Sequence, residues 1–460
     1  MKAFFAWATL GLGTVVALAA GCQSTSDEVT WHQHIAPLVT AKCQGCHSEG
    51  GIAPFSVETY TSARKWAVKM NTSIQDGTMP PWSANDTDEC THPAPFKDDL
   101  RLTEDEKALF QQWLDDGKLE GDPGSAASLP GPADLKLDNP SSALKISSVV
   151  EVSGTGDQFK CFTLDPGYTE DHWVTGVQVT PGNPAIVHHV LVFTDKNDEG
   201  AALAGEDGVY DCFGGPGTTA PNLLGAWAPG AVPAVTPEGM AMPLRVGTKL
   251  VIQVHYHPTG DGVETDDSTR VELRASTKTP EYAGGLFLIG NFPAELPDGM
   301  GLVPGPDDPP SGAAFLIPAG ATAHTETQRF TVPGVPGFPL KLWAVGTHMH
   351  WAGTDMLITV EHDGHASCLV QTPNYDFNWQ RAYFFEGEYR DLPQIAAGDV
   401  LEFRCTYDNS LDNPAVRDVL ESVGETAPSS LLLGEQTTDE MCLGVFGAAV
   451  PIDYASALGL

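Results

Sequence analysis

Between residue 29 and about residue 121, apolar side chains recur at the spacing of amphipathic helices. Short helices are predicted over residues 31–40 and from Ser56, acting as N-cap, to Met70. The clearest helix follows a capping box at Thr103 to Glu106 and is stopped by Gly117. The first part of the chain is therefore predicted to be a small all-α domain.

Beyond residue 142 the pattern changes to short β-type runs separated by Gly and Pro. Residues 122–142 are rich in Gly, Pro, Ser and Ala without periodicity, so we expect a linker there. The predicted strands cover residues 173–179, 186–193, 249–257, 271–275, 285–289, 323–332, 340–350, 356–361 and 400–407. This spacing favours a multidomain protein in which two antiparallel β-sandwich (jelly-roll-like) domains, residues 143–280 and 281–460, follow the helical part.

Residues 1–21 have the pattern of an export signal, because Lys2 precedes an apolar segment that ends in small residues. The ending Leu-Ala-Ala-Gly-Cys resembles a bacterial lipoprotein box, with Cys22 as the lipidated first residue of the mature chain. An uncleaved membrane anchor is the alternative, but the apolar run is barely long enough to span a bilayer. We expect an exported, lipid-anchored protein of the bacterial cell envelope, on the periplasmic side or in the outer membrane.

Acidic residues dominate the charge of the chain. There are 60 acidic and 24 basic residues, which give a formal net charge of -36. A surface of this kind repels phosphate backbones and anionic membranes. Nucleic acid is therefore excluded as a partner, and membrane contact is expected through the lipid anchor only.

A Cys-x-x-Cys-His motif lies in the helical part, at Cys43, Cys46 and His47. In an exported protein the two thiols can form thioethers to haem vinyl groups while the adjacent His ligates the iron. The alternative is a redox or zinc pair beside a chance His. A second candidate iron ligand in the sequence favours the haem interpretation over this alternative.

That second ligand is Met79, in a Thr-Met-Pro-Pro-Trp loop that resembles the axial loop of class I cytochromes c. Met70 is a weaker alternative. Residues 22–121 are accordingly predicted to form a cytochrome c-like domain with one covalently attached haem c.

His348 and His350 follow the apolar run 340–344. On an extended strand alternate side chains share a face, so both could bind one metal ion. Copper or zinc would need a third ligand from elsewhere, and a soft sulfur ligand would favour Cu(I). A pair of solvated strand histidines is the alternative.

Two further histidine pairs lie in apolar runs. His188 and His189 are sequence neighbours, and neighbours on a strand face opposite ways. They could bind one ion only at a strand end or a distortion; otherwise one is buried and one exposed. His255 and His257 form the other pair. Four histidines in two apolar strands are hard to explain by packing, because His is not a usual core residue.

In order, the motifs His-His-Val, Gln-Val-His-Tyr-His, His-Met-His-Trp-Ala-Gly and Asp-Glu-Met-Cys resemble those of the copper type II, ascorbate-dependent monooxygenases. This family contains peptidylglycine α-hydroxylating monooxygenase and dopamine β-monooxygenase. The resemblance runs from about Cys161 to Met441. It implies one copper per sandwich domain across a solvent-filled cleft, and hydroxylation of a C–H bond with O2 and electrons from ascorbate.

By position in these motifs, the resemblance also assigns the ligands. The residues that match the electron-transfer copper are His188, His189 and His255. The residues that match the copper of the catalytic site are His348, His350 and Met441. His257 would share a face with His255 and remains a competing ligand. The resemblance further implies disulfides, which pair Cys161 with Cys212 and Cys405 with Cys442. Cys90 and Cys368 are either free or tie the haem module to the catalytic domain.

Peptide-amidating members of the family hold the substrate carboxylate with an Arg two positions before the His-x-His motif, where this chain has Gly346. Peptide amidation is therefore disfavoured. Trp351 and Phe446 are expected to make the rim of the pocket apolar or aromatic, which favours a neutral or aromatic substrate.

The leading hypothesis is a copper monooxygenase acting on a small organic substrate and O2. It would hold two copper ions and one haem c, and use ascorbate or another reductant. The haem would replace or supplement ascorbate and take electrons from an envelope donor. The alternatives are a non-catalytic haem and copper electron-transfer or copper-handling protein, and an interaction module with structural histidines. A zinc hydrolase is disfavoured because Met is a poor zinc ligand.

Overall fold

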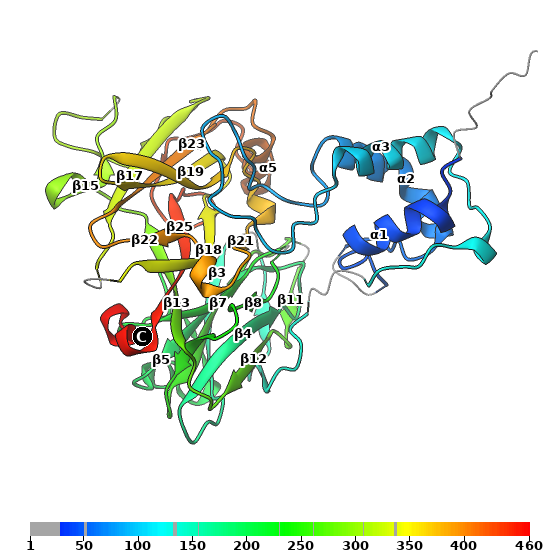
Figure 1. Ribbon diagram of the computed structural model, residues 1–460. Helices are drawn as coiled ribbons and strands as arrows, with labels where there is room; N and C mark the ends of the chain where they lie inside the picture. The colour runs from blue at the N-terminus through cyan, green and yellow to red at the C-terminus, as the bar shows by residue number, and fades with distance from the viewer. Residues whose placement is uncertain are drawn as a thin grey trace, which may run out of the picture.

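The computed structural model describes residues 28–49, 53–131, 136–154, 156–229, 231–260, 262–306, 308–334 and 338–460. It consists of a small helical module beside a larger β-rich body (Figure 1). The predicted signal segment and Cys22 lie outside the described residues. In the described part of the chain, no helix combines the length and the apolar character needed to cross a membrane.

The helical module has one buried core. Its elements are η1 (Trp31–Ile35), α1 (Ala36–Lys42), α2 (Tyr60–Gln75), α3 (Glu104–Asp115) and η2 (Pro123–Ser125). Phe110 and Trp113 of α3 are fully buried and pack with Trp31 and Ile35 of the first turn. The apolar face predicted for α3 therefore holds the module together.

Capping side chains decide where the helices begin. The box predicted at Thr103 is confirmed, since its hydroxyl accepts from Glu106 N and the Glu106 carboxylate accepts from Thr103 N. The start predicted at Ser56 is wrong. The N-cap of α2 is Thr59, because Thr59 and Ser62 form a reciprocal box of their own. This helix also continues past Met70, to Gln75.

In its described residues, the first half of the β-rich body contains twelve strands and one short helix. They are β1 (Ser142–Lys145), β2 (Val150–Val152), β3 (Gln158–Leu164), β4 (His172–Thr180), β5 (Val187–Asp195), α4 (Glu199–Ala204), β6 (Val209–Asp211), β7 (Leu223–Trp227), β8 (Ala234–Val235), β9 (Met240–Leu244), β10 (Lys249–Tyr256), β11 (Glu264–Asp266) and β12 (Arg270–Ser276). A 3-10 turn, η3 (Gly205–Asp207), follows α4.

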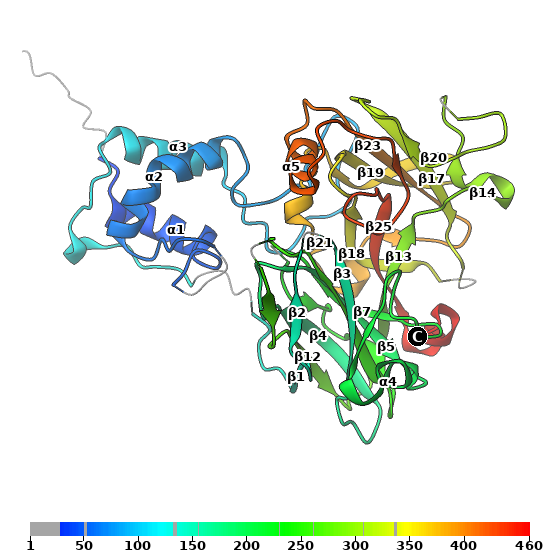
Figure 2. The ribbon, with the colours of Figure 1, turned by 180° about the vertical axis from the view of Figure 1, so that it is seen from behind.

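The second half contains the remaining strands and α5 (Pro414–Val423), which lies on the side of the body that faces the helical module (Figure 2). The strands are β13 (Tyr282–Gly290), β14 (Glu295–Leu296), β15 (Met300–Val303), β16 (Leu316–Ile317), β17 (His324–Thr331), β18 (Leu340–His348), β19 (Gly353–His362), β20 (His365–Thr372), β21 (Ala382–Phe384), β22 (Gln394–Ile395), β23 (Val400–Tyr407), β24 (Leu431–Leu432) and β25 (Leu443–Pro451). The 3-10 turns are η4 (Pro297–Gly299), η5 (Phe377–Trp379), η6 (Tyr389–Asp391) and η7 (Ile452–Leu458).

The predicted β-rich, antiparallel architecture is confirmed. In β23, for example, Leu401, Phe403, Cys405 and Tyr407 are buried while the residues between them are partly exposed. This alternation of period two places one face of the strand on the core. The cytochrome c fold remains a prediction.

One strand joins the two halves of the body. β13 pairs with β7 and β9 of the first half, and along its whole length with β25 of the second. β25 in turn pairs with β18, so a single 15-stranded sheet runs through both halves. A six-stranded sheet, β14-β15-β17-β23-β19-β20, covers the second half. The halves thus share a sheet and a continuous hydrophobic core.

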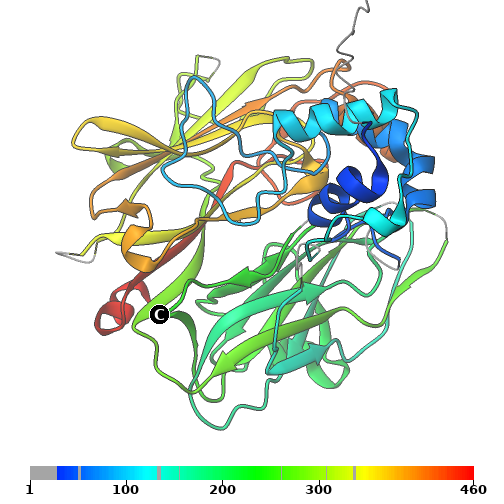
Figure 3. The same ribbon diagram turned by 45° about the vertical axis from the view of Figure 1, so that its right-hand side comes forward.

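An extended segment, residues 82–98, leaves the helical module and lies on the second half of the body (Figures 1 and 3). We call it the arm. Cys90 of the arm is disulfide-bonded to Cys368 of β20, and Tyr383 Oη accepts hydrogen bonds from the backbone N–H groups of Ser83 and Ala84. The possibility that Cys90 and Cys368 tie the two modules together is therefore confirmed.

The other two predicted disulfides are also confirmed. Cys161 pairs with Cys212, and Cys405 pairs with Cys442. The second bond connects β23 to the residue before β25, beside Met441. It fixes the chain next to one of the expected metal ligands.

Candidate metal centres

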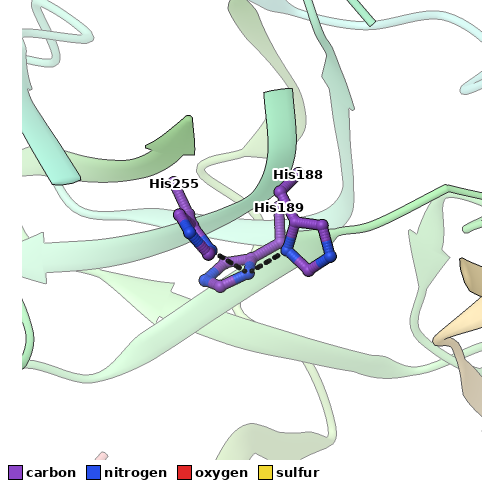
Figure 4. A group of neighbouring side chains, drawn as sticks. All are labelled: His188, His189 and His255. Carbon is purple, nitrogen blue, oxygen red and sulfur yellow. Dashed lines mark hydrogen bonds between the residues drawn. The ribbon is translucent and has the colours of Figure 1, made fainter. Parts of the chain in front are cut away.

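Three histidines from two neighbouring strands converge at the first centre (Figure 4). His189 Nδ1 lies 3.3 Å from His188 Nδ1 and 3.3 Å from His255 Nδ1. The three rings could hold one metal ion, because their ligand atoms all lie within 4.8 Å of one another. The structure therefore brings His188, His189 and His255 together, as the sequence predicts.

A β-bulge makes this convergence possible. β10 pairs with β5 in register up to His255 opposite His189, and then Tyr256 lies opposite Val187. His188 is the extra residue of the bulge, so it escapes the strict alternation of faces and can reach the same point as His189. This is the distortion that two adjacent histidine ligands require.

Asp157 contacts both His255, which lies in β10, and His257, which follows the end of that strand. His257 Nδ1 donates to Asp157 Oδ1 at 2.8 Å, and His257 is not among the three clustered rings. His255 Nε2 lies 3.1 Å from the same carboxylate oxygen, which leaves its Nδ1 for the centre. The preference for His255 over His257 agrees with this geometry.

Burial sets the charge of the first centre. It lowers the pKa of His188 and of His189 well below the ordinary value, and the neighbouring His255 lowers both further. Burial alone would raise the pKa of Asp157, but its contacts with His255 and His257 together lower it. His188 and His189 are thus neutral imidazoles close to a charged carboxylate.

At the second centre, backbone and side-chain oxygens fix the two rings. His348 is the last residue of β18, and its Nδ1 donates to Gln380 Oε1 at 2.6 Å. His350 lies beyond the strand, and its Nδ1 donates to Asp439 O at 2.9 Å. No described residue forms a hydrogen bond with either Nε2 atom, so both can face a metal ion; a hydrogen bond at the other ring nitrogen is the usual way to orient a ligating imidazole. The prediction that both histidines lie on one strand is wrong, because β18 ends before His350.

Both rings of this centre are neutral at ordinary pH. Burial lowers the pKa of His348 to about 4 and that of His350 to about 3. Glu440 ties the centre to Met441, since its carboxylate accepts hydrogen bonds from the backbone N–H groups of His350, Ala352 and Met441. No sequence pattern indicates this role of Glu440.

A cavity of about 390 Å³ lies between the two halves. Its walls carry ligands of both centres, namely His189, His348, His350 and Met441. The rest of the lining is mainly apolar and includes Leu191, Phe193, Leu223, Trp227, Leu286, Leu288, Phe384, Leu443 and Val445. Gln380 and Arg381 also line it.

The expectation that Trp351 and Phe446 line this pocket is wrong. Leu443 and Val445 of β25 line the cavity, and alternation turns Phe446 to the opposite face, where it packs against Phe403. Trp351 packs on Phe377 of η5 instead, with ring centroids 4.3 Å apart.

Phe377 connects the two centres. Its ring stacks on His188 at 4.6 Å and contacts His350 at 5.7 Å between centroids. Ligands of the two centres therefore touch the same aromatic ring. No sequence signal marked this residue, because η5 is a single short turn between strands.

The Cys-x-x-Cys-His motif lies at the end of α1. Cys43 and Cys46 are free thiols, whereas the six cysteines from Cys90 to Cys442 are paired. His47 Nδ1 donates to Phe55 O at 3.1 Å, which leaves Nε2 for an iron ion. Met70 is buried in the core of the helical module, while Met79 is partly exposed. The choice of Met79 over Met70 as the second iron ligand stays a prediction.

The chain is similar to known copper enzymes. The family model described as copper type II ascorbate-dependent monooxygenase, C-terminal domain, matches residues 321–446, which include His348, His350 and Met441. Dopamine beta-hydroxylase from Canis lupus familiaris is 25% identical over 270 residues, which cover 57% of this chain and 40% of that protein. Dopamine beta-hydroxylase from Rattus norvegicus is 26% identical over 242 residues, which cover 50% of this chain and 35% of that protein. The protein of the same name from Bos taurus is 25% identical over 296 residues, which cover 61% of this chain and 44% of that protein.

Residues 321–446 are thus similar to the C-terminal domain of the copper type II ascorbate-dependent monooxygenases, and a larger part of the chain is similar to dopamine beta-hydroxylases. The chain spans less than half the length of these three relatives. Among solved structures, the major capsid protein P2 from Bacteriophage PM2 covers 67% of this chain at 11% identity, with a TM-score of 0.25. A likeness that weak carries no argument.

Proposed function

We propose that this chain, whose second half matches the copper type II ascorbate-dependent monooxygenases, hydroxylates a C–H bond of a small organic substrate. The observation that carries the proposal is the cavity between the halves, whose walls include His189 of one centre and His348, His350 and Met441 of the other. Overall, the substrate, O2, two electrons and two protons would yield the alcohol and water. When bound, copper would supply the one-electron chemistry and the activation of O2.

The donor sets fit copper. The first centre offers three imidazoles whose ligand atoms lie close together, a set that suits a copper ion in either oxidation state. The second offers two imidazoles with free Nε2 atoms and the thioether of Met441, a soft ligand that favours Cu(I) and binds zinc poorly. Buried imidazoles with lowered pKa values need no deprotonation before they bind a metal ion.

The side chains around the second centre have positioning roles. Gln380 and the Asp439 carbonyl fix the orientation of the two rings, and Glu440 fixes the backbone on both sides of the ligand set. The apolar walls of the cavity would bind the body of the substrate and exclude bulk water from the reacting C–H bond.

We further propose that the helical module carries one haem c, attached at Cys43 and Cys46, with His47 and Met79 as iron ligands. Support comes from the two free thiols and from the hydrogen bond that orients His47. A haem with His and Met ligands suits electron transfer. It would supply electrons in place of ascorbate or in addition to it, and an envelope redox protein would be its donor.

The lipid anchor at Cys22 and the location in the bacterial cell envelope are also proposals. They rest on the composition of residues 1–22. Labelling with a fatty acid analogue should mark the parent chain and not Cys22→Ala, and a labelled variant would contradict the anchor.

A non-catalytic electron-transfer or copper-handling protein is the second candidate. The arm is compatible with this candidate, because its disulfide fixes the helical module to the second half of the body whether or not oxygen is inserted. Both candidates require bound copper, so metal analysis cannot separate them. Copper found in protein secreted in the presence of copper would exclude only the interaction module with structural histidines.

Substrate-dependent oxygen uptake separates the two candidates. The copper-loaded protein should consume O2 with ascorbate and at least one member of a panel of C–H substrates, whereas Met441→Ala should not. Bound copper with no substrate-dependent uptake across the panel would leave the electron-transfer function.

A further inference from the structure

Strand alternation around β21 separates two sets of side chains. Gln380 and Phe384 line the cavity. The guanidinium of Arg381 points the other way, where its Cζ atom lies 4.6 Å from the ring centroid of Trp82 and 5.7 Å from that of Tyr383. Trp82 is the first residue of the arm. The short segment that contains β21 therefore faces the second centre on one side and the arm on the other.

The arm packs along this second side of β21. Lys97 N donates a hydrogen bond to Phe384 O at 2.7 Å, and the ring of Phe96 stacks on that of Phe385 with centroids 4.9 Å apart. β21 itself pairs with β18, the strand that ends in His348. One short strand thus separates the arm from a ligand of the second centre.

The Cys-x-x-Cys-His motif lies close to the same aromatic rings. Lys42, the residue before the motif, donates from Nζ to Arg101 O at 3.1 Å, and the Arg101 Cζ atom lies 5.4 Å from the Trp82 centroid. Arg381 lies on the same ring. Trp82 also ends the Thr-Met-Pro-Pro-Trp loop that carries Met79. Both segments proposed to hold the haem therefore meet the body at Arg381.

The charges around Arg381 agree with this placement. Burial raises the pKa of Cys46, and the positive charge of Arg381 lowers it in part. The acidic side chains that influence Arg381 are Asp98 and Asp99, at the end of the arm. No hydrogen bond or salt bridge of the described residues involves the Arg381 side chain, and its Nε atom is buried. Arg381 is thus a fixed positive charge beside the motif.

From Arg381 the chain leads directly to the second centre. A peptide bond joins Arg381 to Gln380, and Gln380 Oε1 accepts a hydrogen bond from His348 Nδ1 at 2.6 Å. Electron tunnelling falls steeply with distance and with each gap between atoms that are not bonded. A connection made of a peptide bond and a short hydrogen bond is therefore a favourable one for an electron.

The connection to the first centre is longer. Gln380 Nε2 donates to Phe377 O at 2.9 Å, and the Phe377 ring stacks on His188 with centroids 4.6 Å apart. This branch passes through the whole of Phe377 and then crosses a gap between two rings. Among the described residues, no hydrogen bond, ion pair or ring contact joins His188, His189 or His255 to the helical module. The first centre is therefore the less direct destination.

We infer that Arg381 and Gln380 connect the Cys-x-x-Cys-His motif to the second centre, so that an electron from a haem at that motif enters the second centre without passing through the first. One electron leaves Fe(II), which becomes Fe(III), and converts Cu(II) at the second centre to Cu(I); no bond forms or breaks. The thioether of Met441 favours Cu(I), which suits this direction. The first centre would supply the other of the two electrons of the overall reaction. The inference rests on the haem and copper of the proposed function, but not on oxygen insertion.

Electron transfer without oxygen or substrate tests the inference in the full-length protein loaded with haem and copper. The oxidised protein is kept anaerobic, a light pulse with a flavin photoreductant reduces a fraction of the haem, and absorbance follows its reoxidation. The rate in His188→Ala should stay within about twofold of the parent, whereas His350→Ala should slow it about tenfold or more. Slowing in His188→Ala as large as that in His350→Ala would overturn the inference.

Electron paramagnetic resonance gives a readout on the parent protein, so the folding of a variant does not limit the test. A Cu(II) ion held by three imidazoles and one held by two imidazoles and a thioether give different signals. In samples frozen during haem reoxidation, the signal of the second centre should disappear in step with it. Loss of the first-centre signal in step with the haem would overturn the inference.

The haem reduction potential tests the placement of Arg381. Removing a positive charge near the iron favours Fe(III), so Arg381→Gln should shift the reduction equilibrium about tenfold toward the oxidised haem, which is about 59 mV for one electron. Arg381→Lys should keep most of the parent potential. Arg245→Gln removes a cation from the ring of Trp173 in the first half and is the matched control, with no shift expected. An unchanged potential in Arg381→Gln would overturn the inference.

These measurements also distinguish the failure of this inference from failure of the proposed function. A chain without covalently bound haem would overturn this inference together with the proposed haem, and would leave the copper monooxygenase standing. Haem oxidation through the second centre without any substrate-dependent oxygen uptake would support the connection and contradict the monooxygenase. Bound haem whose electron arrives at the first centre would overturn the connection alone.

Discussion

The two histidine centres use opposite atoms of the imidazole ring and differ in access. At the first, three Nδ1 atoms point at one another, and only His189 of the three ligands reaches the cavity. At the second, Nδ1 atoms are tied to protein oxygens, and both rings and Met441 line the cavity. A closed set of three ligands suits a metal that only exchanges electrons, and an open set suits a metal that meets a substrate. Access, more than ligand type, separates the two roles.

The largest expected effect comes from removing one ligand of either centre. His350→Ala and His188→Ala should each lose one copper per chain, and each should lower substrate-dependent oxygen uptake on the order of a thousandfold. They should differ in substrate affinity, because His350 lines the cavity and His188 does not. Metal analysis, oxygen uptake and calorimetry on both variants make the comparison. Equal loss of substrate affinity in both would break the distinction between an open and a closed centre.

Asp157→Asn should affect the first centre next most strongly. The Asp157 carboxylate contacts His255 and His257 and accepts a hydrogen bond from Thr437 N of the second half. Loss of the charge should weaken copper binding at the first centre about 10- to 100-fold and lower the free energy of unfolding by about 2 kcal/mol. Chelator competition and urea unfolding at pH 7 measure both effects.

The pH dependence gives Asp157→Asn a sharper signature. Because the folded-state pKa of Asp157 lies below its unfolded value, the stability it contributes is present above about pH 4 and is lost as the pH falls through the folded pKa. The difference in unfolding free energy between parent and variant should therefore shrink only in strong acid. Asp211→Asn, at an exposed ion pair with Lys160, is the control and should change neither copper binding nor this pH dependence.

Gln380→Leu should act on the second centre alone. It removes the acceptor that orients His348, so copper affinity at that centre should fall about tenfold while the first centre keeps its metal. Sequential titration with a chelator resolves the two ions. Gln253→Leu removes a buried hydrogen bond to Cys212 O in the first half and should leave the second centre unchanged. Copper loss from the first centre in Gln380→Leu would contradict this assignment.

The smallest effect is expected for His257→Gln. Its ring contacts Asp157 but lies outside the ligand set, so copper content should stay at the parent level and oxygen uptake within about twofold. His255→Gln, measured in parallel, should lose the copper of the first centre. If the two variants behave alike, His257 is a ligand after all.

Local patterns predicted much of this fold because they depend on neighbours in the sequence. The capping box of α3 and the alternation in β23 follow from side chains a few residues apart. The convergence of His188 and His189 was recognised as requiring a distortion, but the position of the bulge depends on how β10 pairs with β5. His350 lies off its strand for a similar reason, since Glu440 and Asp439 hold it from another part of the chain.

Features built from distant segments were not predictable in the same way. β13 joins both halves through pairing with β7, β9 and β25, which no local pattern encodes. Arg381 appears in the sequence as an ordinary arginine between Gln380 and Ala382. Only the fold shows that its guanidinium lies on the rings of Trp82 and Tyr383, which come from the arm and from β21.

The disulfide of the arm also orders events during maturation in the cell. Cys90 and Cys368 are 278 residues apart, so in a chain that emerges from its N-terminus Cys90 cannot form its bond until the first half of the body and about half of the second have emerged. During this interval the thiol of Cys90 is available for exchange together with those of Cys43 and Cys46, which precede it in the chain. A bond between Cys90 and Cys43 or Cys46 would consume a thiol of the Cys-x-x-Cys-His motif. If haem is attached there, as proposed, attachment before the second half folds would protect both thiols of the motif from Cys90.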